Sequence, residues 1–335
     1  MKTLTGKSLK ALIGMTAFAL MLVVAPQRTS AQSLSAQLSD REIPVTEFNA
    51  IHVSDGFEVT VARGSYGVRL TVDKELSSYI ETYVKGKTLY ISYDEKSVPK
   101  DIRKLYKGKK ALTPVFRAVV YTPQLRSVIL SDNSTLNCLE EYASDQFELT
   151  ASGKSQVRNL SVVANSAKVY LKKNAEATLT LKTERGVEAG LDNSTSLKLT
   201  FTGDELAVNA EGSSKVVADG NCRRVNVFSS GSSVVNIVSD TDKVDLTTEG
   251  SSKVSLSGSA FDMTVKGSRN SSVDALGMSL ETVDANLTGG SSVTVTVSRL
   301  VSVSLAGGSA LYYSGTPEFK IDKIVKSTLA PYGTK

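Results

Sequence analysis

Apolar residues recur at a fixed spacing through the C-terminal two thirds of the chain. Leu206, Val225, Val244 and Met263 follow one another at steps of 19 residues. A second series with the same steps begins two residues later and comprises Val208, Val227, Leu246 and Val265. Around both series apolar and polar positions alternate, which indicates strands with one buried face. A repeat of this length is typical of a solenoid, in which each turn stacks on the previous one.

A short phrase of small residues marks one position in every repeat. It starts with Gly or Asn and continues with Ser or another small polar residue; its first residues are Asn133, Gly153, Asn193, Gly212, Gly231, Gly250, Asn270, Gly290 and Gly308. Gly and Asn enter the positive-φ region most readily, so we expect a corner of the chain at each of them. The serines that follow predict a ladder of hydroxyl groups along these corners, formed by Ser213, Ser232, Ser251, Ser271 and Ser291.

The alternation predicts two strands in each repeat, with a second turn between them. We place this turn at 203–204, 219–220 and 257–258, where Gly, Asp and Ser occur. No helical periodicity is present, and the repeat is too short for a crossover helix. The sequence therefore predicts an all-β fold, a parallel β-helix (β-solenoid) with about 19–20 residues per coil. The regular part spans 131–331, followed by a tail, 332–335. Between 153 and 193 the missing corner falls at either Asn165 or Asn174.

Residues 46–130 alternate as well, but without the repeated phrase. Strands are expected at 48–53, 57–61, 68–72 and 88–93, whereas 77–85 reads as a strand or a short helix. We interpret this region as a first, more irregular set of coils.

A lysine-rich insertion at 95–113 interrupts the strand pattern. One interpretation is a contact with an anionic surface or polymer, for which the candidate residues are Lys104, Lys107, Lys109 and Lys110. The other is a solvated loop or short helix whose apolar residues Ile102, Leu105 and Tyr106 dock on the solenoid. We favour the second interpretation, because isolated basic runs are usually solvated.

The first 31 residues have the features of a secretory signal peptide. Three lysines precede an apolar run from Ala11 to Ala25, and small residues follow it. A linker is expected at 32–45, and the mature protein is expected outside the cytoplasm, without a transmembrane segment. The leader holds four of the 39 basic residues and none of the 34 acidic ones, so the mature chain is close to neutral. This balance argues against nucleic acid as a partner.

Several passages resemble one bacterial family. They are the opening 48–64, the run from Phe116 to Leu136 with its Val-Tyr-Thr-Pro-Gln-Leu, the repeated Gly-Ser-Ser copies, and the ending Tyr312–Pro317. Together they resemble the family described as "putative auto-transporter adhesin, head GIN domain" over roughly 46–331. The resemblance implies a β-helical, secreted or envelope-associated protein with an adhesive role, and it supplies no catalytic residues.

Few residues suggest a catalytic or metal-binding role. The single histidine, His52, lacks a second His or a Cys nearby, which favours a structural role over a catalytic one. We expect Cys138 and Cys222 to be unpaired, because they lie several coils apart and a disulfide needs close Cα atoms. No cofactor or metal motif is found, although Asp132 and Asp192 precede corners and could hold calcium weakly.

One pair of carboxylates supports an enzymatic alternative. Asp192 and Glu211 both precede a corner in consecutive coils, so stacking should bring them together, as acid and nucleophile of a glycan-cleaving enzyme require. The other interpretation is a solvated ladder of charges. Our main hypothesis is a non-enzymatic solenoid that binds surface glycans or envelope and host proteins. The alternatives are a carbohydrate-active enzyme and a purely structural envelope protein.

Overall fold

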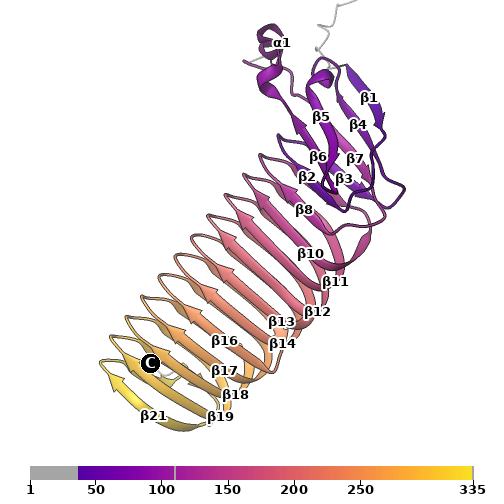
Figure 1. Cartoon of the computed structure of the whole chain (residues 1–335). Helices are drawn as coiled ribbons and strands as arrows, with labels where there is room; N and C mark the ends of the chain where they lie inside the picture. Colours follow the sequence, from indigo (N-terminus) through magenta and orange to yellow (C-terminus); the bar gives the residue numbers. More distant parts are fainter. Residues whose placement is uncertain (1–36, 109–110, 334–335) are drawn as a thin grey trace, which may run out of the picture. The chain divides into compact units, whose positions relative to one another are not determined.

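The structure, a computed structural model, describes residues 37–108 and 111–333 (Figure 1). The predicted signal peptide lies outside these residues. The strands are β1 Leu38–Ile43, β2 Ala50–Val53, β3 Glu58–Ala62, β4 Gly67–Asp73, β5 Ile80–Lys85, β6 Thr88–Tyr93, β7 Phe116–Tyr121, β8 Ser127–Leu130, β9 Thr135–Cys138, β10 Glu141–Ser152, β11 Gln156–Lys172, β12 Glu176–Asp192, β13 Ser196–Ala210, β14 Lys215–Ser229, β15 Val234–Asp240, β16 Lys243–Thr248, β17 Lys253–Gly267, β18 Ser272–Leu287, β19 Ser292–Ala306, β20 Ala310–Ser314, β21 Glu318–Val325 and β22 Thr328–Pro331. The helices are two 3-10 turns, Ser77–Tyr79 and Glu95–Ser97, and α1, Lys100–Leu105.

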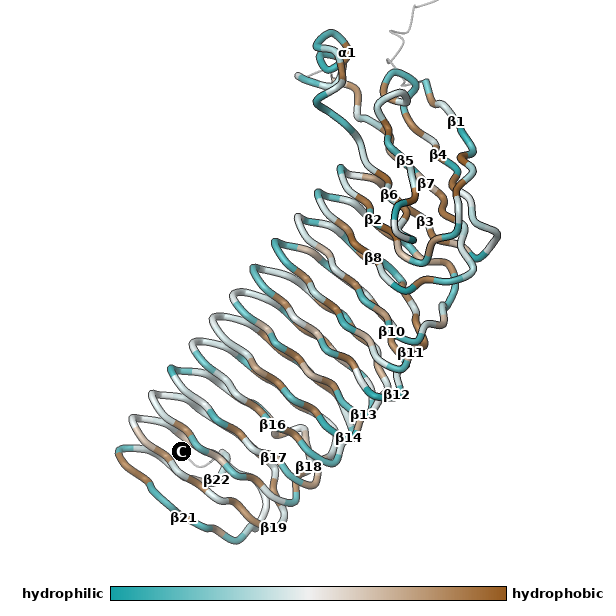
Figure 2. The backbone as a smooth tube through the Cα atoms, viewed as in Figure 1, coloured by the Kyte–Doolittle hydropathy of each residue, from teal (hydrophilic) through white to brown (hydrophobic). Residues whose placement is uncertain are grey.

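The described chain winds as a parallel β-solenoid of about 11 turns, as the periodicity predicts (Figure 1). From β8 to β22 each strand pairs in parallel with the equivalent strand of the next coil. The two apolar series are true columns: Leu206 pairs with Val225, and Val208 pairs with Val227. All eight residues of these series are buried. The alternation of hydrophilic and hydrophobic residues along each coil is visible in Figure 2.

Positive φ angles confirm every corner predicted from Gly or Asn. The φ angle is 66° at Asn133, 70° at Gly212 and 78° at Gly290. The open question between 153 and 193 is resolved in favour of Asn174, which has a φ of 64°. Asn165 lies within β11 instead, where its side chain donates to Asp145.

The hydroxyl ladder is one residue away from its predicted place in three coils. Ser213, Ser232 and Ser251 are exposed, and the residues after them are buried instead. The register explains the error: Lys253 pairs with Ser272, so Gly250 is equivalent to Arg269 and not to Asn270. The prediction is right at Ser271 and Ser291. The buried column is Ser134, Ser155, Thr195, Ser214, Ser233, Ser252, Ser271, Ser291 and Ser309.

The second turn expected in each coil is a bend inside a continuous strand at all three predicted places, which lie within β13, β14 and β17. Parallel pairing continues through the bend, because Gly203 pairs with Cys222 and Phe201 with Gly220. Glycine is required at 220, since a Cβ atom there would come within 1.8 Å of the Phe201 carbonyl oxygen. At these three places close stacking of the coils therefore takes the place of a separate loop.

The N-terminal region combines the expected irregular coils with antiparallel strands. β2 and β3 stack in parallel on β8 and β9, and β6 and β7 stack in parallel on β2 and β3. Beyond them β5 pairs antiparallel with β6, β4 with β7, and β1 with β4. The positive φ angles of Gly86 and Lys87 give β5–β6 the tight turn of a hairpin. Part of the linker expected at 32–45 forms strand β1, because this polar segment pairs with the edge of β4.

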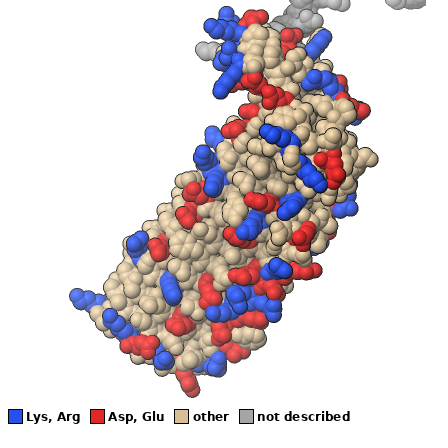
Figure 3. Space-filling model, viewed as in Figure 1, with Lys and Arg blue, Asp and Glu red and all other residues tan. Residues whose placement is uncertain are grey.

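The lysine-rich insertion contains the short helix α1, as the second interpretation predicts, but only two of the three apolar residues expected to dock do so. Ile102 and Tyr106 are partly buried against the hydrophobic core, whereas Leu105 is 42% exposed. Lysine and arginine side chains gather over α1 in Figure 3, while elsewhere on the visible face both signs of charge are interspersed. Among the described residues no helix is long and apolar enough to cross a membrane.

Candidate functional site

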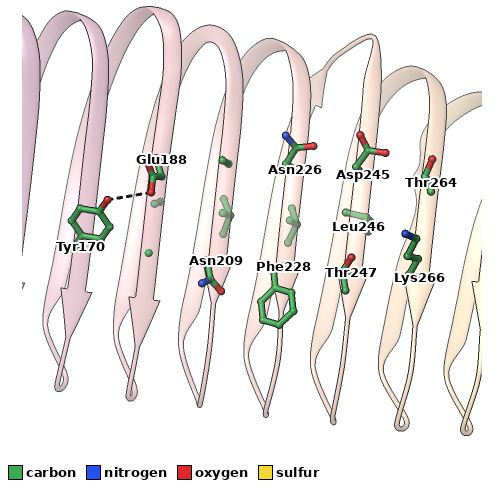
Figure 4. A pocket seen from close by; sticks show the side chains of 15 residues that line it. Tyr170, Glu188, Asn209, Asn226, Phe228, Asp245, Leu246, Thr247, Thr264 and Lys266 are labelled. Atoms are coloured by element: carbon green, nitrogen blue, oxygen red, sulfur yellow. Dashed lines mark hydrogen bonds between the residues drawn. The ribbon is translucent and has the colours of Figure 1, made fainter.

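The candidate site is an open groove on one face of the solenoid. It is formed by the outward-pointing residues of the strand segments 168–171, 188–191, 207–210, 226–229, 245–248 and 264–267, which we call the front face. The groove has a volume of about 610 Å³. Two parallel columns of side chains flank it, and Ala189, Val208, Val227 and Leu246 between the columns complete its lining (Figure 4).

The first of these, the aromatic column, runs along the front face in strict register. Tyr170 pairs with Gly190, Gly190 with Asn209, and Asn209 with Phe228. Thr247 and Lys266 continue the column into the next two coils. Neighbouring strands are about 4.8 Å apart, so the Tyr170 and Phe228 backbones are roughly 14 Å apart across three steps.

Small residues between the two aromatic side chains create the hollow. The ring of Tyr170 lies close beside Gly190, since a Cβ atom there would be 3.1 Å from Cδ1 of the tyrosine. Ala207 occupies the neighbouring column in the coil after Gly190. Phe228 is 36% exposed, so its ring is available to a ligand in the groove. Two aromatic surfaces therefore flank a strip with little side-chain bulk.

The second column is polar and contains Lys168, Glu188, Ala207, Asn226, Asp245 and Thr264 in successive coils. Glu188 accepts a hydrogen bond from the Tyr170 hydroxyl at 3.1 Å, and its Oε2 lies 3.0 Å from the Lys168 ammonium. The hydrogen bond from Lys168 lowers the pKa of Glu188 below its ordinary value. The Tyr170 ring is thus held in place from its hydroxyl end.

Each carboxylate that lines the groove is matched by a nearby cation. Glu188 pairs with Lys168, and Asp245 lies 3.1 Å from the Lys243 ammonium. The remaining polar groups are neutral amides and hydroxyls, apart from Lys266 at one end. The groove is therefore apolar and hydrogen-bonding in character and carries little net charge.

The aromatic column continues beyond the groove toward the N-terminal end. In the strand register, Ile129 and Thr150 lie between Tyr170 and His52. The ring centroids of His52 and Tyr90 are 5.2 Å apart. Tyr90 in turn stacks on Tyr83, with ring centroids 5.1 Å apart. Burial lowers the pKa of His52, against the opposing effects of Asp132 and Asp55. The only histidine of the sequence is thus part of an aromatic row.

The structure also locates the other residues selected from the sequence. Lys104 and Lys107 are exposed at and after α1, whereas Lys109 and Lys110 lie outside the described residues. Cys138 and Cys222 are buried and free, as predicted, and burial raises the pKa of Cys138 to about 11. Within 37–108 and 111–333, no group of three or more His, Cys, Asp or Glu side chains could hold a metal ion, so Asp132 and Asp192 have no such cluster around them.

Asp192 and Glu211 occupy equivalent positions in consecutive coils, as the enzymatic alternative requires. The pairing of Leu191 with Ala210 places them next to each other in the register. Each carboxylate, however, accepts a hydrogen bond from a neighbouring amide on its own coil: Asn193 bonds to Asp192 at 2.8 Å, and Asn209 bonds to Glu211 at 3.1 Å. These contacts are those of a solvated row of side chains at the edge of the front face.

The aromatic column was not found from the sequence. Tyr170 lies in the stretch where two corners were possible, and each choice of corner aligns it with different residues of the later coils. With the corner at Asn174, the 19- to 20-residue repeat places Tyr170 and Phe228 in one column. The alignment of Tyr170 with Phe228 can therefore be read from the sequence only once the corner of this one coil is known.

Comparison with known proteins gives one family. Its profile, described as "putative auto-transporter adhesin, head GIN domain", matches residues 47–186 and 231–317. Among the curated proteins nothing matches this chain.

The chain also matches solved structures from two Parabacteroides species. A crystal structure of a "putative adhesin" from Parabacteroides merdae is 15% identical, with a TM-score of 0.40, and the match covers 88% of this chain and 96% of that one. A "putative lipid binding protein" from Parabacteroides distasonis is 16% identical, with a TM-score of 0.36 and the same coverage. With identities and TM-scores this low, the assignment rests on the family profile. Because the profile covers more than half of the sequence, the chain belongs to the head GIN domain family of putative auto-transporter adhesins.

Proposed function

We propose that this protein is an extracytoplasmic adhesion module that binds an uncharged glycan chain along the groove of its front face. The family supports a role in binding surface partners. The observation that carries the choice of ligand is the placement of two aromatic side chains, the half-buried Tyr170 and the exposed Phe228, on either side of a strip of small and amide residues.

The chemistry of the groove matches a sugar polymer. Sugar rings present apolar C–H faces, which pack on aromatic side chains, and hydroxyl groups around their edges, which need hydrogen-bonding partners. Tyr170 and Phe228 supply the first kind of contact. Asn209, Asn226 and Thr264 supply the second. A polyanion or polycation would gain little, because Glu188 and Asp245 are already neutralised by lysines.

The regularity of the face favours a linear ligand. Equivalent positions repeat at about 4.8 Å along the solenoid, so a polymer lying parallel to the axis meets the same backbone geometry at each coil. The groove spans coils from Tyr170 to Lys266 and is open along its length. An extended chain can therefore bind without entering a closed pocket.

The test is binding of neutral polysaccharides to the purified protein, measured by calorimetry or on a glycan array. Tyr170→Ala and Phe228→Ala should each weaken binding by about tenfold or more, as expected for aromatic anchors of an interface. Phe261→Ala is the matched control, because Phe261 is 56% exposed and lies outside the groove. Equal losses in all three variants, or binding that prefers charged polymers, would contradict the proposal.

The enzymatic alternative keeps one observation in its favour, the adjacent positions of Asp192 and Glu211. It predicts release of reducing ends from a bound polysaccharide, with turnover lost in Asp192→Asn or Glu211→Gln. Binding without product, unchanged in these two variants, supports adhesion. No binding to any glycan or envelope protein would favour a purely structural role.

A further inference from the structure

Three ring side chains gather on the outer surface near the N-terminal end of the solenoid, and we call them the N-terminal aromatic cluster. Tyr83 of β5 pairs with Tyr90 of β6, and Tyr90 pairs with His52 of β2. The two tyrosine rings are nearly parallel, with an interplanar angle of 13°, and the His52 ring is tilted by 51° against Tyr90. Tyr83 is 46% exposed, and the other two side chains are half-buried. The cluster therefore presents an aromatic surface to solvent.

The polar atoms of this cluster are available to a ligand. No described residue forms a hydrogen bond with the hydroxyl groups of Tyr83 and Tyr90 or with the ring nitrogens of His52. The hydroxyl of Tyr170, by contrast, donates to Glu188. A phenol or an imidazole without a partner inside the protein can donate to, or accept from, the hydroxyl groups of a bound molecule. The cluster thus combines flat apolar rings with unused hydrogen-bonding groups.

The cluster lies on the same outward column as the groove of the front face. His52 pairs with Ile129, and Ile129 pairs with Thr150. Thr150 pairs with Tyr170, at which the groove begins. Tyr90 and Tyr170 are four strand steps apart on this column, which is roughly 19 Å at a spacing of about 4.8 Å. Figure 1 shows the strands β6, β2, β8, β10 and β11 in succession along the solenoid.

A shallow hollow beside this path provides hydrogen-bonding groups between the two aromatic positions. It has a volume of about 150 Å³, and its lining includes Arg126, Ser127, Gln146, Glu148 and Lys168. Ser127 pairs with Glu148 and Glu148 with Lys168, so the polar column of the groove continues through this hollow. Both signs of charge are present, which favours neither a polyanion nor a polycation. A chain of hydroxyl-bearing units therefore finds polar partners from one aromatic position to the next.

We propose that the N-terminal aromatic cluster is a second binding site for the uncharged glycan, so that one chain lies along the solenoid from Tyr83 to Phe228. The inference rests on the glycan-binding function proposed above. The two ends of this path are eight strand steps apart, about 38 Å at a spacing of about 4.8 Å. The apolar face of one sugar unit packs on the parallel rings of Tyr83 and Tyr90, as others do in the groove. A chain that reaches both sites binds the second one intramolecularly, which increases its overall affinity.

The dependence of affinity on chain length tests this arrangement. The probes are two size fractions of one neutral glucan, with extended lengths of about 20 Å and about 45 Å, chosen to fit the groove alone or the whole path at about 4.8 Å per strand. Calorimetry should show that the long fraction binds at least about tenfold more tightly than the short one. In Tyr83→Ala and in Tyr90→Ala the long fraction should lose this advantage, because only the groove remains. Continued binding of the short fraction shows that each variant is folded.

Tyr312→Ala is the matched control, because Tyr312 is half-buried on β20 and pairs with Thr294, outside this column. It should keep the full length dependence. Equal affinities of the two fractions for the unmodified protein would overturn the second site and leave the proposed function intact. A length dependence that survives both Tyr83→Ala and Tyr90→Ala would overturn it as well. If neither fraction nor any intact neutral polysaccharide binds, the proposed function itself is wrong and the second site falls with it.

Discussion

The two ends of the solenoid are made of similar alternating strands, but their apolar residues differ in solvent exposure. At the N-terminal end, Ile91 of β6 lies within the β5–β6 hairpin and is 1% exposed. At the C-terminal end, Ile321 of β21 is 55% exposed. A repeat covers only its neighbour, so the terminal face of a repeat array needs a segment that does not repeat. The irregular N-terminal region supplies such a cover for one end only.

The comparison predicts that truncating the same side chain at the two ends has different costs. Ile91→Ala should lower the free energy of unfolding by about 2–5 kcal/mol, because it leaves a cavity in a closed core. Ile321→Ala should cost less than about 1 kcal/mol, since over half of the side chain is already in water. Urea unfolding at low protein concentration measures both. Similar costs would mean that the C-terminal end is covered as well.

Hydrogen exchange should distinguish the two ends of the described chain. The outer amides of β21 should exchange fast, because no described strand pairs with its outer edge. The amides of β6 should be protected, because β6 pairs with β2 on one side and with β5 on the other. Slow exchange of the outer β21 amides would contradict this view.

Alkaline pH should affect the N-terminal end first. Burial and the nearby carboxylate of Asp73 raise the pKa of Tyr106, which follows α1 and packs against the hydrophobic core at this end. Because the folded pKa is higher than the unfolded one, its contribution is complete below pH of about 10 and is lost as the pH rises above that value. Unfolding free energies at several alkaline pH values should therefore decline less in Tyr106→Phe. Tyr332→Phe, at the exposed C-terminal end, is the control and should follow the wild type.

The smallest effect is expected in mild acid and again concerns the N-terminal end. Burial lowers the pKa of His52, so protonation favours the unfolded chain. Its contribution is complete above pH of about 6.5 and is lost as the pH falls from there through the lowered folded pKa. Since this is the only histidine, His52→Asn should flatten the stability profile between about pH 5 and 7. An unchanged slope in the variant would assign the effect to carboxylates.

Within the coils, most of the fold followed from local patterns. The step of 19 residues between Leu206 and Val225 defined the coil, and Gly212 or Asn270 defined a corner, because few other residues adopt positive φ without strain. The hydroxyl ladder was placed one residue early at Ser213, since a one-residue change of register occurs between Gly250 and Asn270. Alternation in a strand says which residues share a face, but not with which neighbour they align.

The sequence alone determined the coil length, the corners and the buried columns, because these depend on periodicity and on the conformational range of single residues. Only the tertiary structure decided the antiparallel pairing of β4 with β7 and of β5 with β6, the aromatic column from Tyr170 to Phe228 and the exposure of Ile321. Pairing direction, cross-coil neighbours and the covering of an end all depend on segments far apart in the chain. The same alternating pattern is buried in the middle of the array and open at its end.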